Sequence, residues 1–331
     1  MKIAVVSPKP EAVQVDKLGW VADGFRSAGH DVTRVHDLAG ARRADAECEL
    51  LLFDQKASGL NRCELIAQAL APHRAIWAQW WRDLIAFEPH APLAEQPFVR
   101  SFGDLMRAMD IVFVKERTLL DEYALLGINA RWLDQACPAD MPACTHGERP
   151  EWDVLVLGST TYEQRRQDAA ALVAEGYRVL WAGLPGSEPV PRGVEWRPWL
   201  HPLAGLPKLV GRCAIVLGVD WRCDLPGYTS DRSYLAAGMG ACYVARYVDY
   251  GASSPPAAYS PAAALAAWIY DDRESLLEAV RAALADRAER ERRGAHARSV
   301  VMARHTYRSR AEQIAAIVEE RCVVGDAVKG F

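Results

Sequence analysis

The residues best suited to chemistry lie between Ser230 and Tyr247, in the run SDRSYLAAGMGACYVARY. Asp231 and Arg232 stand where a loop is expected to enter a helix, and the unpaired N–H groups of a helix N-terminus favour anionic phosphate. An arginine can also donate to two phosphate oxygens at once. The segment therefore suits an anionic diphosphate, although an ordinary helix–strand unit with a solvated Asp–Arg pair would have the same local sequence.

A second turn with related chemistry is GSTTYEQRR, at 158–166. It offers a glycine for close backbone approach, hydroxyl groups, and two arginines one turn into the expected helix. Neither this turn nor the first turn of the chain, SPKP at 7–10, matches the glycine-rich dinucleotide fingerprint or a P-loop. A nicotinamide or flavin enzyme and a P-loop kinase are therefore disfavoured. A capped helix with two solvated arginines is the alternative interpretation.

Alternating strands and helices must position these turns. Expected strands lie at 3–6, 31–35, 50–53, 75–78 and 111–114, and the pattern restarts with strands at 154–157, 178–182, 214–219 and 241–247. Helical patterns lie between them, and this alternation predicts the α/β class with two doubly wound, Rossmann-like domains. Because open α/β sheets bind ligands at the carboxyl ends of their strands, we expect the site in a cleft between the two domains.

The segment CPADMPACTHGERP, at 137–150, interrupts this periodicity with three prolines. We therefore expect an N-terminal domain over 1–147 and a C-terminal domain over 148–308. A last helical stretch, over 309–331, would pack back on the N-terminal domain.

Composition narrows the class of protein. The chain has 331 residues, of which 50% are hydrophobic, and a net charge of −4, so it has no overall electrostatic signature of nucleic-acid binding. No apolar run reaches the roughly 18 residues needed to span a bilayer, and the N-terminus does not resemble a signal peptide, which predicts a cytoplasmic protein. The eight cysteines are scattered without a C-x-x-C pair, which predicts reduced thiols and no zinc site.

Four blocks of the C-terminal half resemble the donor domain of GT-B glycosyltransferases. The resemblance is most specific to the group related to the CgeB spore-maturation protein, with its glycosyltransferase family 1-like C-terminal domain. The blocks are VLVLGSTTYEQRR at 154–166, LGVD at 217–220, TSDRSYLAAGMGACYVARY at 229–247 and the tail at 270–314 with RHTYRSRAEQI. In the N-terminal half, IWAQWWRDL at 76–84 and the run at 110–133 are similar more loosely.

The resemblance implies transfer of a sugar from a nucleotide diphosphate sugar that binds to the second domain. Among such donors it favours a UDP-sugar. Arg232 would hold the pyrophosphate and stabilise it as the leaving group. The donor-binding residues implied in this way are Gly158, Ser159, Thr160, Arg165, Arg166, Gly183, Asp220, Trp221, Tyr228, Thr229, Ser230, Asp231 and Arg232. One position departs from the pattern: Leu235 stands where relatives commonly carry a glutamate for the ribose hydroxyls.

The acceptor would bind the first domain, where we expect contacts from Trp80, Trp81 and Lys115. Asp83, beside the tryptophan pair, is the candidate base for an inverting reaction, although an aspartate there could equally cap a turn or helix. A retaining reaction could use the donor phosphate instead. GT-B enzymes generally need no metal, and the chain has no Asp-x-Asp motif, so we expect none.

The nature of the acceptor stays open between a modified DNA base, a protein, a glycan and a small molecule. Two other functions suit the same fold. One is a nucleotide-sugar epimerase, and the other is a non-catalytic nucleotide-sugar-binding protein.

Overall fold

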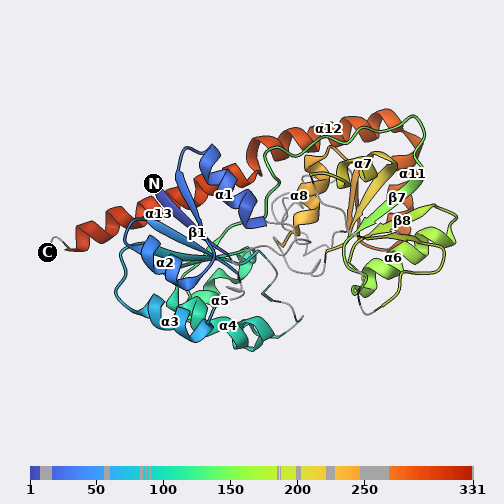
Figure 1. Cartoon of the computed structure of the whole chain (residues 1–331). Helices are drawn as coiled ribbons and strands as arrows, with labels where there is room; N and C mark the ends of the chain where they lie inside the picture. Colours follow the sequence, from blue (N-terminus) through green and yellow to red (C-terminus); the bar gives the residue numbers. More distant parts are fainter. Residues whose placement is uncertain are drawn as a thin grey trace. The chain divides into compact units, whose positions relative to one another are not determined.

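The computed structural model describes residues 1–7, 17–55, 60–82, 85–86, 88, 91–184, 186, 188–198, 203–220, 228–246 and 268–329, with side chains described as far as Arg321. The chain forms two compact units (Figure 1). Unit 1 comprises Met1–Gln135 and Thr306–Phe331, and unit 2 comprises Ala136–His305. The boundaries expected at 147/148 and 308/309 lie 12 residues and three residues, respectively, after these divisions.

Unit 1 is built on a six-stranded parallel sheet in the order β2-β1-β3-β4-β5-β6. The chain crosses from one side of β1 to the other between β2 and β3, so the strand order reverses beside β1. The strands are β1 (Lys2–Val6), β2 (Asp31–Val35), β3 (Leu50–Asp54), β4 (Ile76–Trp80), β5 (Ile111–Val114) and β6 (Ala130–Trp132). The helices are α1 (Lys17–Ser27), α2 (Leu38–Asp45), α3 (Arg62–Leu70), α4 (Pro97–Ala108), α5 (Leu120–Leu125) and α13 (Tyr307–Lys329), with 3-10 turns η1 (Leu93–Glu95) and η2 (Arg117–Leu119).

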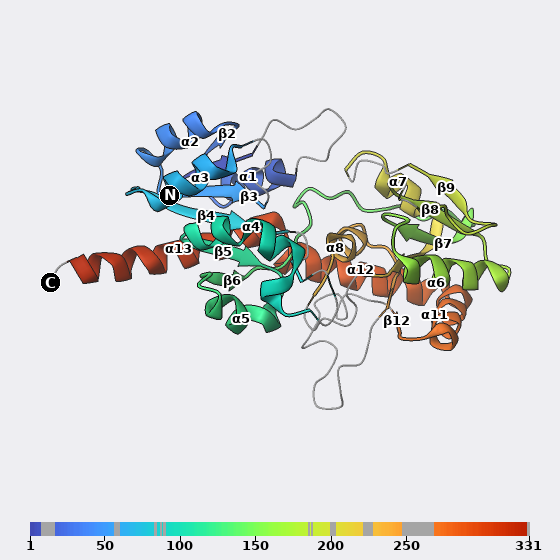
Figure 2. The same ribbon diagram turned by 90° about the horizontal axis from the view of Figure 1, so that it is seen from below.

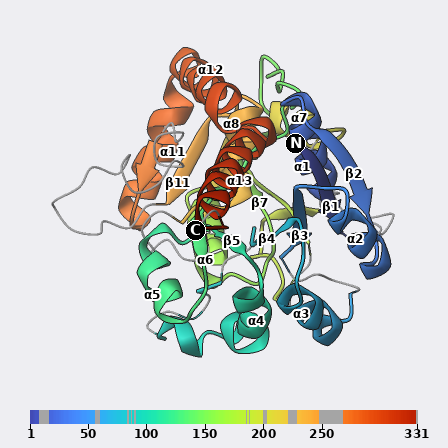
Figure 3. The same cartoon turned by 90° about the vertical axis from the view of Figure 1, so that its left-hand side faces the viewer.

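Helices cover both faces of this sheet. Alternate strand residues such as Ala4 and Leu51 pack with buried residues of α2, α3, α4 and α5. On the other face α1 and α13 pack on each other, and Figure 3 shows the strands between these two helices and α3, α4 and α5. The close approach of α1 and α13 depends on Gly24, because a Cβ there would lie 2.5 Å from the carbonyl oxygen of Tyr307.

Unit 2 also contains a six-stranded parallel sheet, in the order β12-β11-β10-β7-β8-β9. The chain moves outward from β7 through β8 to β9 and then returns to place β10 on the other side of β7. The strand order therefore reverses between β7 and β10, the position at which doubly wound sheets bind ligands. The strands are β7 (Trp152–Leu157), β8 (Val179–Ala182), β9 (Glu195–Arg197), β10 (Cys213–Gly218), β11 (Tyr243–Arg246) and β12 (Trp268–Tyr270).

Two groups of helices cover the unit 2 sheet: α6 (Glu163–Ala174) and α11 (Arg273–Ala285) on one face, and α7 (Leu206–Gly211), α8 (Asp231–Gly238) and α12 (Arg287–Arg304) on the other. Val154 and Val156 belong to the first core, whereas Leu155 and Leu157 belong to the second, as the alternation of a strand requires. Figure 2 shows α6 and α11 together, and α11 contacts α6 directly. Within the described ranges, no helix combines the length and the apolar character needed to cross a membrane.

Candidate functional site

Two glycines bring the ends of β7 and β8 together at the carboxyl edge of the unit 2 sheet. Gly158 has φ +115°, and its N–H donates to the carbonyl of Ala182 at 2.9 Å. A Cβ on Gly183 would lie 1.8 Å from the carbonyl oxygen of Gly158, so only glycine fits there. That same carbonyl accepts a hydrogen bond from the buried indole of Trp181 at 2.8 Å. The turn after β7 is therefore held in one conformation by its neighbouring strand.

Arg165, in the first turn of α6, ties this turn to the end of β10. Its Nη1 donates to the carbonyl of Ser159 at 2.7 Å, and its Nη2 donates to the carbonyl of Val219 at 2.6 Å. The side chain is fully buried and stacks on the ring of Tyr162, with 4.5 Å from Cζ to the ring centroid. Burial, together with the nearby charge of Arg232, lowers the pKa of Arg165 below its ordinary value. Arg165 therefore links the turn after β7 to the end of β10 and places a cation beside that turn.

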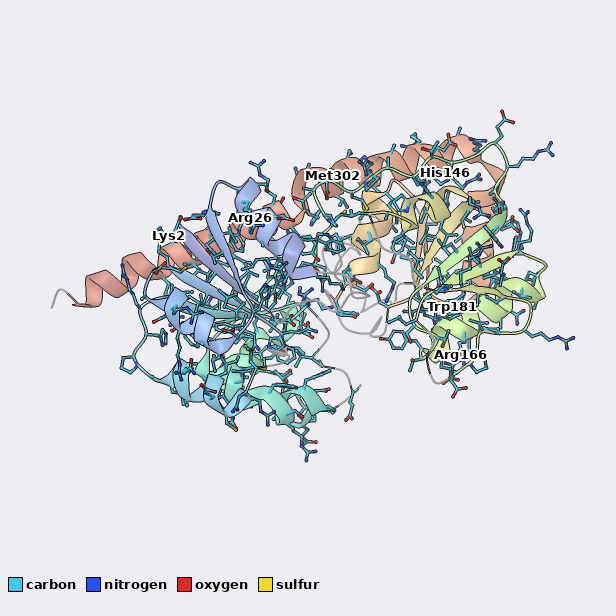
Figure 4. All side chains as sticks on the ribbon, viewed as in Figure 1. Lys2, Arg26, His146, Arg166, Trp181 and Met302 are labelled. Atoms are coloured by element: carbon cyan, nitrogen blue, oxygen red, sulfur yellow. The ribbon has the colours of Figure 1, made fainter. Side chains whose placement is uncertain are left out.

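The remaining polar groups of the turn divide between internal bonds and the surface. The buried hydroxyl of Thr160 accepts from the N–H of Gly186 at 2.7 Å. Arg166, which Figure 4 labels on α6, donates through Nη1 to the carbonyls of Thr160 and Thr161, at 2.6 and 2.9 Å, so it also supports the turn. The hydroxyl of Ser159, which lies 2.8 Å from that of Thr161, is on the exposed side.

The start of α8 is held by one carboxylate. Ser230 is the N-cap residue, and its N–H and hydroxyl both donate to Asp220, the N–H at 3.2 Å. Arg232 donates through Nη2 to the same carboxylate at 3.2 Å. Burial opposes the charge of Arg232, but Asp220 and Asp231 more than offset this effect and raise its pKa, so the guanidinium stays charged.

The two arginines converge at Gly158. A Cβ built on this glycine would lie 2.8 Å from Nη1 of Arg165 and 3.1 Å from Nη1 of Arg232. The Nε atoms of both arginines are buried and have no hydrogen-bond partner among the described residues. The structure therefore brings together two cations and the N-terminus of α8 at the point where the strand order reverses.

Other residues predicted for this site differ in accessibility. Thr229 is fully buried, whereas Tyr228 and Asp231 are partly exposed. Trp221 lies outside the described residues. Leu235 is 2% exposed, and its side chain packs in the core of unit 2.

The acceptor contacts predicted for Trp80 and Trp81 do not fit this structure, because both indoles lie in the core of unit 1. Trp80 packs edge-on against Tyr307 of α13, and Trp81 packs against Phe98 and Phe102 of α4. Neither has exposed surface, since the apolar area of an indole at the end of a buried strand is better removed from water. Lys115 is also buried, at 3% exposed. The candidate base Asp83 lies outside the described residues.

The carboxyl edge of the unit 1 sheet carries charged groups that sequence reasoning missed or left unassigned. Arg82 pairs with Asp54 at 2.8 Å. Glu116 is fully buried and accepts the N–H of Ile85 at 2.6 Å, and burial raises its pKa. The pairing of Asp54 with Arg82 had no local signal, because the two residues are 28 positions apart, at the end of β3 and just after β4.

Two further contacts in unit 2 were not predicted from the sequence. They are the Trp181 bond to the Gly158 carbonyl and the 2.7 Å bond between the hydroxyls of Ser233 and Tyr243. In the part of the chain that the structure describes, no group of three histidine, cysteine, aspartate or glutamate residues could hold a metal ion.

Comparison with solved structures places the architecture among GT-B glycosyltransferases. The DNA-modifying enzyme β-glucosyltransferase matches with a TM-score of 0.62 and 11% identity, over 96% of this chain and 100% of that chain. An Escherichia coli trehalose-6-phosphate structure bound to UDP-2-fluoro glucose matches with a TM-score of 0.58 and 11% identity, over 96% and 99% of the two chains. The lipopolysaccharide outer core galactosyltransferase WaaB matches with a TM-score of 0.56 and 10% identity, over 97% and 100%. These likenesses confirm the predicted fold of two Rossmann-like domains.

Sequence comparison then identifies the family. The model of the glycosyl transferase-like family matches residues 145–316, which is 172 of the 331 residues and includes all the unit 2 residues of the site described above. The chain belongs to this family, and the predicted glycosyltransferase class is confirmed. Comparison with curated proteins finds no match.

Proposed function

We propose that the protein transfers a sugar from a nucleotide diphosphate sugar to a hydroxyl acceptor, and that unit 2 binds the diphosphate at the carboxyl edge of its sheet. The observation that carries this proposal is the convergence of Arg165 and Arg232 at Gly158. Two guanidinium groups, one fully buried and one mostly buried, lie beside a helix N-terminus and form a strong site for an anion with two or three negative charges. Family membership supplies the reaction class.

The chemistry that these residues support is stabilisation of the leaving diphosphate. As the bond between the sugar and the phosphate breaks, negative charge grows on the phosphate oxygen. Arg232 and the N–H groups at the start of α8 are positioned before the reaction, so they need little reorganisation to stabilise that charge. Because side chains supply this charge, we propose that the reaction proceeds without a metal ion, which turnover in the presence of EDTA would test.

For the donor we propose a UDP-sugar. The supporting observation is that solved structures of this fold hold such molecules, UDP-glucose in a T4 phage enzyme and UDP-2-fluoro glucose in the E. coli structure. We also retain the CgeB-like group as the finer family assignment. Since Leu235 is buried, the ribose must be recognised by other groups than a glutamate at that position.

For the acceptor we propose binding to unit 1, with Asp83 as the base if the reaction inverts the sugar. The chemical nature of the acceptor stays open. A cytoplasmic location remains part of the proposal, and the six described cysteines, all free thiols, agree with it.

The test is nucleotide release from a panel of UDP, GDP, ADP and CMP sugars with mixed acceptors. We expect turnover with one nucleotide class and its loss in Arg232→Ala. Arg178→Ala is the control, because Arg178 forms an exposed pair with Asp153 at the other end of the sheet. Conversion of the donor without an acceptor would indicate an epimerase, and nucleotide binding without turnover would indicate a binding protein. No nucleotide binding at all would contradict the proposal.

A further inference from the structure

We propose that Asp220 is a built-in counter-anion of the diphosphate site: it occupies the phosphate-binding groups when no donor is bound, competes with the diphosphate and promotes release of the nucleotide product. This inference rests on the proposed function. It changes the role of Asp220, which the family resemblance implied to be a donor contact, into that of a competitor for the same groups.

The hydrogen bonds of Asp220 identify the groups for which it competes. One carboxylate receives the backbone N–H of Ser230, the hydroxyl of Ser230 and Nη2 of Arg232. A helix N-terminal N–H, a hydroxyl and a guanidinium are the donors that proteins use to bind phosphate oxygens. Asp220 therefore presents to α8 the same kind of anionic oxygens that a diphosphate would present.

The two arginines carry donors that Asp220 does not use. Arg165 and Arg232 both reach Gly158, and both retain a buried Nε with no partner in the described structure. The side chains of Asp220 and Arg232 are only 13% and 15% exposed, so their interaction is weakly screened by solvent. A diphosphate spans more donors than Asp220 does, so it can displace the carboxylate from part of this set.

Competition of this kind has two consequences for catalysis. Each binding event must first break the bonds between Asp220 and the start of α8, which weakens nucleotide affinity. After sugar transfer, the return of Asp220 to Ser230 and Arg232 helps to expel the nucleotide diphosphate. Where product release limits turnover, removal of this carboxylate slows the enzyme although it tightens binding.

The experiment measures the Kd of inorganic pyrophosphate and of UDP by calorimetry, for the full-length protein without divalent cations. Asp220→Asn removes the negative charge while the amide oxygen can still accept from Ser230. We expect both ligands to bind about three- to tenfold more tightly to this variant. We also expect kcat to fall and product inhibition by UDP to become stronger, in contrast to an impaired site, where inhibition would weaken.

Asp231→Asn is the matched control, because it removes one negative charge from the adjacent turn. A general effect of charge would tighten binding equally in both variants, which would contradict the inference. Unchanged or weaker binding in Asp220→Asn would also contradict it, and would indicate that Asp220 orients Arg232 for the donor. Both results leave the proposed function intact provided that the wild-type protein binds UDP, whereas a lack of UDP binding to every variant would contradict the proposed function itself.

A second readout covers the case in which Asp220→Asn is unstable. Bound ligand raises the melting temperature according to its affinity, so pyrophosphate should stabilise the variant more than it stabilises the wild type. Asp220→Ser, which retains a small hydrogen-bonding group without charge, should give the same sign of change. A smaller ligand-induced shift in both variants than in the wild type would overturn the inference.

Discussion

The two parallel sheets of this protein use charge differently at their carboxyl edges. In unit 1, Arg82 pairs with Asp54, and the buried Glu116 accepts a backbone N–H of Ile85. In unit 2, Arg165 and Arg232 meet at Gly158, and Arg232 hydrogen-bonds to the carboxylate of Asp220. Arg165 uses backbone carbonyls instead of a counter-ion of its own.

The difference between the two edges lies in how their charged groups are compensated. A charged group that is removed from water must be compensated, either by an internal partner or by a ligand. The unit 1 edge is compensated internally, whereas the unit 2 edge concentrates positive charge at a helix N-terminus. The same architecture therefore yields one edge with clustered positive charge, as the proposed diphosphate site requires, and another whose charged groups have internal partners.

The largest expected change in the free energy of unfolding comes from removing an indole at the carboxyl edge of the unit 1 sheet. Trp81→Ala deletes a fully buried side chain that contacts Phe98 and Phe102, and should lower the free energy of unfolding by about 3–5 kcal/mol. Urea denaturation followed by circular dichroism measures this change. Trp81→Phe preserves the aromatic packing and should cost less than half as much. A ligand-binding indole would behave differently, with little loss of stability in either variant.

Replacement of a glycine at the carboxyl edge of the unit 2 sheet should cause the next largest loss of stability. A Cβ on Gly183 would collide with the Gly158 carbonyl, so Gly183→Ala should cost about 3 kcal/mol or more, since backbone must move. Gly176→Ala is the control, because Gly176 has φ +87° but nothing within 4 Å of an added Cβ. Its cost should be only about 1–2 kcal/mol, from the left-handed backbone alone. Equal unfolding midpoints for the two variants would show that the close approach of β7 and β8 is unimportant.

Two arginine variants, one at each sheet edge, test whether UDP binding depends on unit 2 alone. Arg232→Ala should weaken UDP binding about 100-fold, because truncation of a buried charged donor costs roughly 2–5 kcal/mol. Arg82→Ala breaks the ion pair with Asp54 and should destabilise unit 1 while the Kd of UDP changes less than about twofold. Calorimetric titration of both variants measures these values. A similar loss of UDP affinity in both would remove the proposed distinction.

The smallest effect is a pH dependence located in unit 1. Burial lowers the pKa of His73, but its 2.8 Å bond to Asp110 and the charge of that carboxylate outweigh burial and raise the pKa overall. A raised pKa in the folded state stabilises the protein below about pH 6.5, and this contribution is lost as the pH rises through the folded-state value. Because the pair is partly exposed, we expect less than about 1 kcal/mol. The difference in unfolding free energy between pH 5.5 and pH 8.5 should shrink in His73→Gln.

Much of the fold could be predicted because buried parallel strands are continuous apolar runs. The strands expected at 3–6, 31–35, 50–53 and 111–114 are confirmed almost to the residue. The helix α12 was missed, since its sequence is rich in arginine and only Gly294, Ala297 and Val301 are buried. Short edge strands such as β9 and β12, with three residues each, are too brief for a periodic pattern.

The two turns of the candidate site could be predicted from the sequence, but their convergence in space could not. The residue types at 158–166 and 230–232 indicated two anion-binding turns, and both lie at the carboxyl edge of the unit 2 sheet. Their convergence at Gly158 depends on β10 lying beside β7, which no local pattern encodes. The same limit explains the error at Trp80 and Trp81, because a tryptophan pair at a strand end has the same sequence whether it is buried or exposed.

The most direct test of the central claim is amide hydrogen exchange of the full-length protein with and without UDP, read by mass spectrometry. We expect slower exchange in peptides covering 158–161 and 228–233, at the turn after β7 and the start of α8. We expect no change in peptides covering 50–55 and 76–82, at the carboxyl edge of the unit 1 sheet. Protection of the unit 1 peptides alone, or of neither set at saturating UDP, would contradict the claim that unit 2 binds the nucleotide diphosphate.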